Sequence, residues 1–307
     1  MILLVWMIAG AVVFYLILTL YLSLLVQQIP RRPVSDPPDW GSIEDTFVPA
    51  IDGGRLEVWR IEPERESRGT VLLAHGWGRN RDRMVNRARM FGSMGYTTVV
   101  HSARDHGNSS PRFVMNALRF AEDIEAVINW IGEPVVLYGH SAGSGGAILT
   151  AARRPEKVRL LFLEASYAYT RPALLSLYRW FNRVVGTLLG PMILFWMNLY
   201  YRGMPDRVSP ARLAPSVKCP VMLIHGENDR RFPVEFARVL QRSFAPGQAT
   251  LFITPGAGHS DSSSSPGYRQ AVQAFLDSHR LNALETGFFK TPDTPESRIR
   301  NALETIH

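Results

Sequence analysis

The chain has 307 residues, of which 46% are hydrophobic and 20% charged, which is enough for one large globular domain with a sizeable core. Its formal net charge is +7, and most of the positive charge is arginine. No nucleic-acid motif accompanies it, so we expect anionic lipid headgroups and no nucleic acid as partners. The single cysteine excludes an internal disulfide framework.

An apolar segment at the start of the chain predicts a transmembrane helix. Residues 2–26 carry no charge, and at about 1.5 Å per residue a helix of this length crosses a hydrocarbon core of about 30 Å. A cleaved signal peptide is the alternative, but the segment lacks a basic n-region and a small-x-small cleavage pattern. Arg31 and Arg32 follow it, and the positive-inside rule then places the body of the protein on the cytoplasmic side.

Residues 27–42 are rich in proline and predict a stiff, extended linker that holds the domain away from the bilayer. The domain itself is expected over residues 43–280. It opens with two apolar segments that flank Asp52-Gly53-Gly54, a sequence typical of a β-hairpin turn.

Short apolar runs then alternate with segments of helical period. We expect strands at residues 70–74, 96–100, 135–138, 158–163, 221–224 and 249–254, and helices at residues 80–94, 113–130, 142–154, 233–244 and 266–279. This alternation predicts an α/β fold with a mostly parallel sheet flanked by helices. Several arginines in 80–94 indicate either a solvated helix face or a face turned toward lipid headgroups.

A sharp turn in the middle of the domain has a chemical use. Residues 133–150 are typical of a strand, then the turn Gly139-His140-Ser141-Ala142-Gly143, then a helix. A serine at such a turn is held in strained backbone geometry with its hydroxyl above the sheet, and the glycines are needed because a Cβ there would collide with neighbouring backbone. Here the chain resembles the α/β-hydrolase family, over residues 46–280.

This resemblance implies an oxyanion hole. His75-Gly76-Trp77-Gly78 stands where the family carries its second donor, so the backbone N–H groups of Trp77 and Ala142 are expected to stabilise the oxyanion. An ordinary glycine turn is the alternative. A later loop, residues 105–109, is similar to the family's R-G-H-G-x-S loop, but Asp105 stands in place of a glycine, and we assign this loop a structural role.

The resemblance also implies a catalytic triad. His225-Gly226-Glu227-Asn228-Asp229 matches the family's H-G-x-x-D motif and assigns the acid to Asp229, with Glu164 and Glu227 as alternatives. His259 lies in a glycine loop after the last strand and is the expected base. Ser141, Asp229 and His259 follow each other in the family's chain order, and together they would attack a carbonyl through an acyl-enzyme.

Residues 166–218 interrupt the alternation, at the place where the family carries a lid over its active site. The segment is rich in aromatic residues and carries no charge from 184 to 201; the candidates for substrate binding are Trp180, Phe181, Phe195 and Trp196. Three interpretations remain open: a helical lid that lines an acyl pocket, a lid whose aromatic face also enters the bilayer, and a second spanning helix interrupted by Gly186, Gly190 and Pro191.

The anchor, the aromatic lid and the arginine-rich surface favour a lipophilic ester or thioester, and hence an activity like that of a lysophospholipase, monoacylglycerol lipase or deacylase. A serine peptidase or amidase of the same fold is one alternative, and a non-catalytic membrane-tethered scaffold is another. No metal or organic cofactor is expected, and the oligomeric state stays open. We expect Cys219 to be an inert buried thiol.

The last segment, residues 281–307, is polar and contains Asn-Ala-Leu-Glu-Thr twice, starting at Asn282 and at Asn301. The repeated pentapeptide is too short for a domain repeat. We expect a loosely ordered tail here and derive no function for it.

Overall fold

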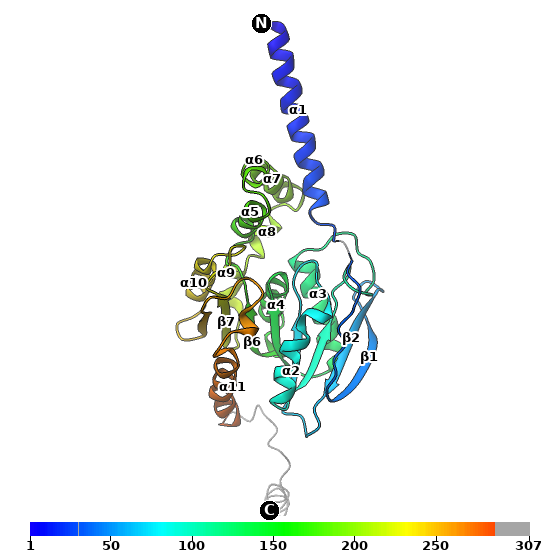
Figure 1. The fold of residues 1–307 in the computed structure, drawn as a ribbon, viewed down its shortest axis with the longest axis vertical. Coiled ribbons are helices and arrows are strands. Elements are labelled where there is room, and N and C mark those ends of the chain that lie inside the picture. Colours follow the sequence, from blue (N-terminus) through cyan, green and yellow to red (C-terminus); the bar gives the residue numbers. More distant parts are fainter. Residues whose placement is uncertain (30, 286–307) are drawn as a thin grey trace, which may run out of the picture. The chain divides into compact units, whose positions relative to one another are not determined.

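The computed structural model describes residues 1–29 and 31–285 of the chain. The chain divides into two units, Met1–Ser265 and Pro266–His307, and each is described by itself. The first unit holds a sheet with helices on both faces, a group of inserted helices and the long N-terminal helix α1 (Figure 1).

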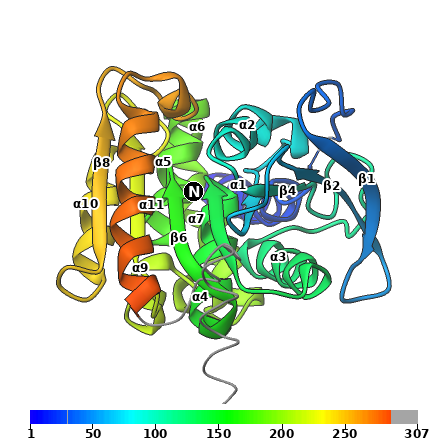
Figure 2. The same ribbon diagram turned by 90° about the horizontal axis from the view of Figure 1, so that it is seen from below.

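One eight-stranded sheet forms the centre of the first unit, in the order β1-β2-β4-β3-β5-β6-β7-β8. The strands are β1 (Ser42–Pro49), β2 (Arg55–Glu62), β3 (Thr70–Ala74), β4 (Thr97–His101), β5 (Val135–His140), β6 (Val158–Glu164), β7 (Val221–Gly226) and β8 (Ala249–Thr254). β1 and β2 pair antiparallel with each other, as do β2 and β4, and all other pairs are parallel. In Figure 2, β1 lies at one edge and β8 at the other. The predicted hairpin and the mostly parallel α/β sheet are therefore confirmed.

Five short helices are inserted between β6 and β7, and we call them the inserted helices. They are α5 (Thr170–Phe181), α6 (Arg183–Leu188), α7 (Gly190–Tyr200), α8 (Met204–Arg207) and α9 (Pro210–Leu213). Since α6 ends at Leu188 and α7 rises only about 16 Å, neither is long enough to cross a membrane. The interpretation of this segment as a second spanning helix is therefore wrong.

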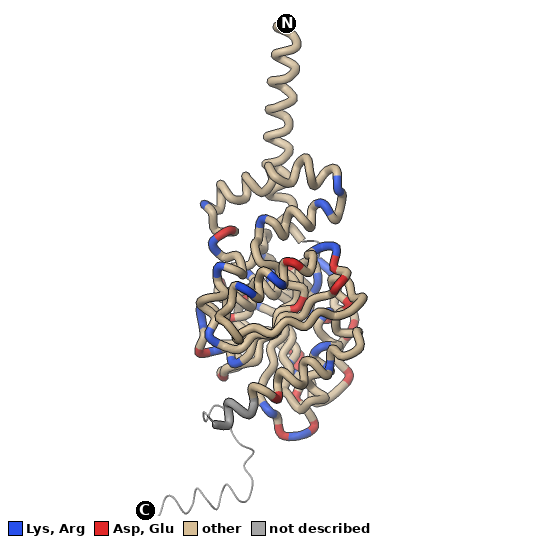
Figure 3. The backbone as a smooth tube through the Cα atoms, turned by 90° about the vertical axis from the view of Figure 1, so that its left-hand side faces the viewer, with Lys and Arg blue, Asp and Glu red and all other residues tan. Residues whose placement is uncertain are grey.

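Helix α1 (Ile2–Leu25) is long and apolar enough to cross a membrane by length and composition, and it is the one such helix among the described residues. A signal sequence has the same properties. Figure 3 shows α1 without any charged residue. Its first half is exposed along its whole surface, whereas Thr19 and Ser23 in its second half are buried where α1 packs on α7.

The proline-rich linker is hydrogen-bonded to the domain at several points. Arg31 donates hydrogen bonds to the carbonyls of Gly107 and Ser109, at 3.1 and 2.7 Å. The amide of Ser35 donates to Asp82 at 2.7 Å, and Asn80 donates to the carbonyls of Arg32 and Pro33. The segment is extended because proline forbids helix here, but side chains of the domain fasten it along the surface. Pro30 lies outside the described residues.

The arginine-rich segment forms a short 3-10 turn, Arg81–Met84, followed by helix α2 (Val85–Ser93). Two of its arginines point inward: Arg81 pairs with Asp45 at 2.7 Å, and Arg87 forms a bidentate pair with Glu164 at 2.5 Å for both bonds. Both guanidinium groups are buried. Neither expected role, a solvated face or a headgroup-facing patch, therefore applies to these two residues.

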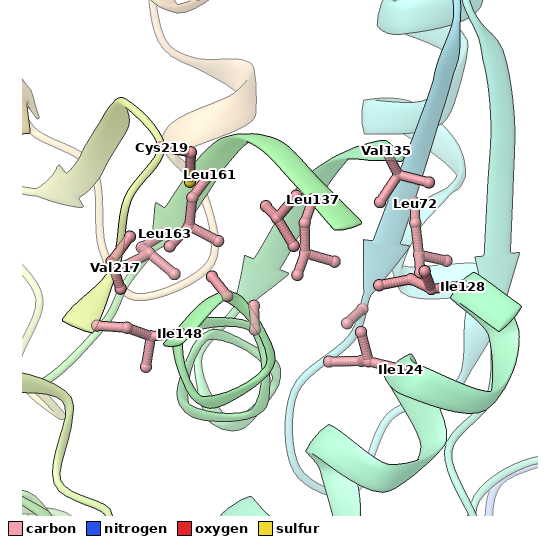
Figure 4. Packing of buried hydrophobic residues seen from close by; sticks show 14 of the residues in the cluster. Leu72, Ile124, Ile128, Val135, Leu137, Ile148, Leu161, Leu163, Val217 and Cys219 are labelled. Atoms are coloured by element: carbon pink, nitrogen blue, oxygen red, sulfur yellow. The ribbon is translucent and has the colours of Figure 1, made fainter. Parts of the chain in front are cut away.

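The main core lies between the parallel strands and three helices on one face of the sheet, α3 (Ala117–Ile131), α4 (Ala142–Arg153) and α10 (Val234–Ser243). Figure 4 shows how Leu72, Leu137 and Leu163 of the strands meet Ile124, Ile128 and Ile148 of the helices. On the opposite face, Phe91 of α2 packs edge-on against Tyr138 and Phe162. Covered on both faces, the central strands can be apolar throughout.

The second unit contains helix α11 (Tyr268–Glu285), which extends beyond the predicted end at residue 279. Residues 281–285 of the predicted tail thus belong to a helix. The remainder of the tail, residues 286–307, with the second copy of the pentapeptide, lies outside the described residues.

Candidate active site

The strand-to-helix turn between β5 and α4 holds Ser141 in strained geometry. Its backbone angles are φ 54° and ψ −117°, a conformation that non-glycine residues seldom adopt. The amide of Ser141 donates to the carbonyl of Glu164 at 2.9 Å. A Cβ on Gly139 would lie 2.6 Å from the carbonyl oxygen of Gly143, and one on Gly143 would lie 2.4 Å from that of His75. Both glycines are therefore required for this turn to fit against β3.

Three side chains from separate loops meet at this turn. The hydroxyl of Ser141 lies 2.9 Å from Nε2 of His259, and Nδ1 of His259 lies 2.7 Å from Oδ2 of Asp229. Asp229 and His259 are buried, while Ser141 is partly exposed. In this arrangement the carboxylate fixes the imidazole tautomer with Nδ1 protonated, so that Nε2 can take the serine proton.

The other oxygen of Asp229 is also satisfied, because the amides of Arg231 and Phe232 donate to Oδ1 at 2.8 and 3.0 Å. Burial alone would raise the pKa of Asp229, but the hydrogen bond and charge of His259 and the amide of Phe232 outweigh it, and the pKa lies below its ordinary value. The carboxylate is therefore ionised at neutral pH.

The two alternative acids are occupied elsewhere. Glu164 is fully buried and accepts hydrogen bonds from Arg87 and from the hydroxyl of Tyr138, all at 2.5 Å. Burial raises the pKa of Glu164, but the charge of Arg87 outweighs it and lowers that pKa to about 2. Glu227 is exposed and accepts from the amide of Gly256. Neither side chain is hydrogen-bonded to His259.

The backbone amides of Trp77 and Ala142 have no hydrogen-bond acceptor among the described residues. Ala142 is the first residue of α4, where the N–H groups have no partner within the helix. The side chains of Trp77 and Ala142 pack against the same small cluster, formed by Ala103, Met115 and Phe120. Two free amide N–H groups beside a serine hydroxyl can donate hydrogen bonds to a developing oxyanion.

Two histidines form hydrogen bonds that hold the loop of Trp77, and one of them, His106, belongs to the loop that was expected to be structural. Nε2 of His106 accepts from the amide of Gly78 at 3.2 Å, and Nε2 of His75 accepts from the amide of Ala103 at 3.0 Å. Burial lowers the pKa of His106 to about 4, so it is neutral and able to accept. Asp105 adopts φ 62° and thus keeps the left-handed conformation that a glycine would provide, which aspartate tolerates.

His140 supports His259, the candidate base. Its Nε2 donates to the backbone carbonyl of His259 at 3.1 Å, and the two rings lie edge to face at 5.5 Å. Burial lowers the pKa of His140 to about 3, so the ring is neutral and can form this bond with a protonated Nε2. Arg83 holds the next residue of the loop, because it donates to the carbonyl of Ser260 at 2.9 Å. Only the position of His140 beside Ser141 could have indicated its role.

Of the four aromatic candidates for substrate binding, Trp180 contacts the loop that carries Asp229, because the guanidinium of Arg231 stacks on its ring at 4.2 Å. Trp196 instead donates a hydrogen bond to Thr19 of α1, and Phe181 and Phe195 are exposed. The sequence analysis missed Phe232, whose ring lies 5.1 Å from that of His259 and packs with Tyr167 and Leu177. The position of Phe232, three residues after Asp229, is the feature of the sequence that could have indicated this contact.

The described residues contain no group of three or more His, Cys, Asp or Glu side chains that could hold a metal ion. Cys219 is buried in the main core, and burial raises the pKa of its thiol to about 12. The hydrogen bond between Ser141 and His259 suits nucleophilic attack by a hydroxyl with general-base assistance.

Comparison with known proteins agrees with this fold. A model of the alpha/beta hydrolase family matches residues 71–272. A monoacylglycerol lipase of Mycolicibacterium smegmatis is 23% identical over 253 residues, which cover 70% of this chain and 89% of that protein. Among solved structures, a thermophilic esterase from Thermogutta terrifontis superposes with a TM-score of 0.58 at 20% identity, covering 77% of this chain and 99% of its own. A membrane phospholipase A, described as a bacterial virulence factor, superposes with a TM-score of 0.60 at 21% identity. The match covers 91% of this chain and 97% of that protein's chain.

Proposed function

The chain belongs to the alpha/beta hydrolase family, and on this premise we propose that it is a membrane-anchored serine hydrolase that cleaves a lipophilic carboxylic ester or thioester. The observation that supports the proposal most directly is the continuous relay from Asp229 through His259 to Ser141, with distances of 2.7 and 2.9 Å. The lipase and esterase names of the relatives support an ester or lipid substrate.

In the proposed reaction, Oγ of Ser141 attacks the carbonyl carbon while its proton passes to Nε2 of His259. Asp229 stabilises the resulting imidazolium, and the amides of Trp77 and Ala142 bind the oxyanion. The tetrahedral intermediate collapses when the leaving alcohol or thiol takes the proton from His259. Water, deprotonated by the same histidine, then attacks the acyl-enzyme. The bond to Oγ of Ser141 breaks as Oγ takes the proton back from His259, and the carboxylic acid is released.

The same proposal includes the membrane. In it α1 is retained as an anchor, because its buried polar residues Thr19 and Ser23 contact α7 in the folded domain, a contact that cleavage would remove. The catalytic domain lies on the cytoplasmic side, on the basis of Arg31 and Arg32. Protease protection of the domain in vesicles of known orientation would test that side.

A fluorophosphonate probe tests the chemistry. We expect the purified protein to be labelled, and we expect both Ser141→Ala and His259→Ala to abolish labelling, because the probe reacts only with an activated serine. Glu66→Gln, at an exposed carboxylate in the loop after β2, is the matched control and should be labelled like the parent. Absence of labelling in folded, lipid-reconstituted parent protein would favour the non-catalytic scaffold, and hydrolysis of amides in preference to esters would favour the peptidase.

A further inference from the structure

Helix α1 and the inserted helices are joined by a row of polar contacts. The hydroxyl of Tyr15 donates to the carbonyl of Leu188 at 2.8 Å, and Trp196 donates to Thr19 at 3.1 Å. One and two turns further along α1, Tyr200 donates to the carbonyl of Ser23 at 3.0 Å, and the side chain of Gln27 bonds to Tyr200 and Tyr201 at 2.6 and 2.5 Å. The contact therefore extends over the whole C-terminal half of α1.

The length of α1 restricts where this contact can lie. At about 1.5 Å per residue, the part of α1 before Tyr15 rises only about 20 Å, which is too short to cross a hydrocarbon core of about 30 Å. If α1 spans the bilayer, the segment around Tyr15 and Thr19 must lie inside the hydrocarbon. Leu188 and Trp196, which contact those two residues, must then lie there as well.

The outer face of α6 and α7 is suited to that environment. From residue 184 to 201 the chain has no charged side chain, and its large apolar residues are exposed on the inserted helices: Phe181, Val184, Val185, Leu188, Phe195 and Leu199. Leu188 alone is 63% exposed. Tyr200 and Tyr201 meet Gln27 where α1 would leave the hydrocarbon, the depth that amphipathic aromatic rings prefer.

We infer that α6 and α7 are immersed with the C-terminal half of α1 in one leaflet of the bilayer, and that an acyl-ester lipid reaches Ser141 directly from that leaflet. The immersion follows from the contacts with α1, whereas the route of the substrate rests on the proposed function. Figure 1 shows these helices beside the lower part of α1, on the side of the domain from which α1 rises.

The oxyanion amides lie close to the level of the membrane surface. Ile29 lies only four residues after the end of α1. It packs against the cluster of Ala103, Met115 and Phe120, on which Trp77 and Ala142 also pack. The ester groups of membrane lipids lie at the boundary between hydrocarbon and headgroups. A lipid can therefore present its carbonyl to Ser141 while its acyl chain stays in the leaflet, beside the apolar face of the inserted helices.

Depth measurement in the full-length protein tests the immersion. Leu188→Cys, Ile17→Cys and Ile43→Cys would each carry a nitroxide label, in vesicles of phosphatidylcholine and phosphatidylglycerol. Ile43, also exposed, begins β1 at the edge of the sheet remote from Ser141 and is the matched control. The parent, in which Cys219 is buried, gives the labelling background. We expect the label at Leu188 to collide with oxygen in preference to a water-soluble nickel chelate, as at Ile17, and the label at Ile43 to show the reverse.

If the label at Leu188 is as accessible to the nickel chelate as that at Ile43, while Ile17 is protected, the immersion is wrong. Access of the chelate to Ile17 as well would show that α1 does not span these bilayers, and this too would overturn the inference.

A second experiment tests the route of the substrate. Leu188→Glu places a carboxylate in the proposed hydrocarbon contact, and we expect hydrolysis of a long-chain acyl-ester lipid in vesicles to fall by about tenfold. Hydrolysis of a short, water-soluble ester should stay unchanged, and Ile43→Glu should leave both rates unchanged. If Leu188→Glu and Ile43→Glu hydrolyse the lipid in vesicles at equal rates, the proposed route of the substrate is refuted. If the parent hydrolyses neither substrate, the proposed function fails, while the depth measurement still decides the immersion.

Discussion

At the scale of single residues, the site depends on which carboxylate faces His259. Asp229 accepts hydrogen bonds from two backbone amides through one carboxylate oxygen and from the imidazole of His259 through the other. Its position is therefore determined before any substrate binds. Glu164 is ionised too, but its oxygens are taken by Arg87 and Tyr138. Both carboxylates are buried and negative, and only one is available to the base.

Asp229→Asn should therefore lower kcat by roughly 10³ to 10⁴, because the amide favours the wrong imidazole tautomer and cannot stabilise the imidazolium. Glu164→Gln, the same chemical change at the other buried acid, should cost far less in kcat. Steady-state kinetics with a soluble ester would measure both. An equal loss in the two variants would reassign the acid.

The pairing of Glu164 also predicts a pH dependence of stability. Its folded pKa of about 2 lies below the ordinary 4.5, so the carboxylate contributes stability above about pH 4.5 and this contribution is lost as the pH falls toward 2. The free energy of unfolding of the parent should decrease across this window. Glu164→Gln should be less stable at neutral pH and should show a flatter profile. Denaturant unfolding from about pH 6 to about pH 2.5 would measure this, and parallel profiles would contradict the assignment.

At the scale of elements, the turn between β5 and α4 is fixed by its contact with β3. Gly143 faces the carbonyl oxygens of Ala74 and His75, which belong to the end of β3 and the residue after it. Because β3 and β5 are paired neighbours, this contact brings the loop of Trp77 beside Ser141. The close approach of backbone to backbone thus builds the oxyanion site as well as the turn.

Gly143→Ala should therefore disrupt the site, because its Cβ would lie 2.4 and 2.5 Å from two backbone oxygens that cannot move independently. We expect a loss of stability of about 3 kcal/mol or more, with loss of fluorophosphonate labelling. Gly145→Ala, in the same helix, meets at 2.4 Å the hydroxyl of Tyr167, the far end of a side chain, and should be tolerated much better. Thermal unfolding of the two variants would measure their losses of stability. Similar losses of stability would argue against a special constraint at Gly143.

At the scale of the whole molecule, α1 and the domain are integrated. The linker is tied down through Arg31 and Ser35, Ile29 packs against the same cluster as Trp77 and Ala142, and α1 packs on α7. In place of a domain held away from the bilayer, these contacts favour a domain that lies against it, as the inferred immersion of the inserted helices requires.

Deleting residues 1–32 should consequently leave a domain that still binds lipid. We expect the truncated protein to float with phosphatidylglycerol-containing vesicles even at high salt, because the apolar face of α6 and α7 remains and apolar contacts are not screened. Leu188→Glu in the truncated chain should weaken flotation. A truncated domain that is folded by circular dichroism but stays wholly in the soluble fraction would show that α1 alone holds the protein on the membrane.

Local patterns in the sequence were sufficient to predict the hairpin, the alternation of strands and helices, the turn at Ser141 and the long apolar helix. Each of these depends on neighbours along the chain: a glycine next to a serine, apolar residues at a fixed period, or a long run without charge. The resemblance to the α/β-hydrolase family implied Ser141, Asp229 and His259 as a triad, and the structure brings these three side chains within hydrogen-bonding distance.

Tertiary structure alone decided the remaining features. The pairing of Arg87 with Glu164, the support of His259 by His140 and the packing of α1 on α7 join residues between 77 and 177 positions apart. Local composition does not specify which buried side chains will contact each other, because each contact depends on how the strands are ordered in the sheet. The sequence alone therefore determined the fold class and proposed the reactive groups. The surroundings of those groups, and the face of the domain that we infer to meet the lipid, depend on contacts made only when distant segments pack together.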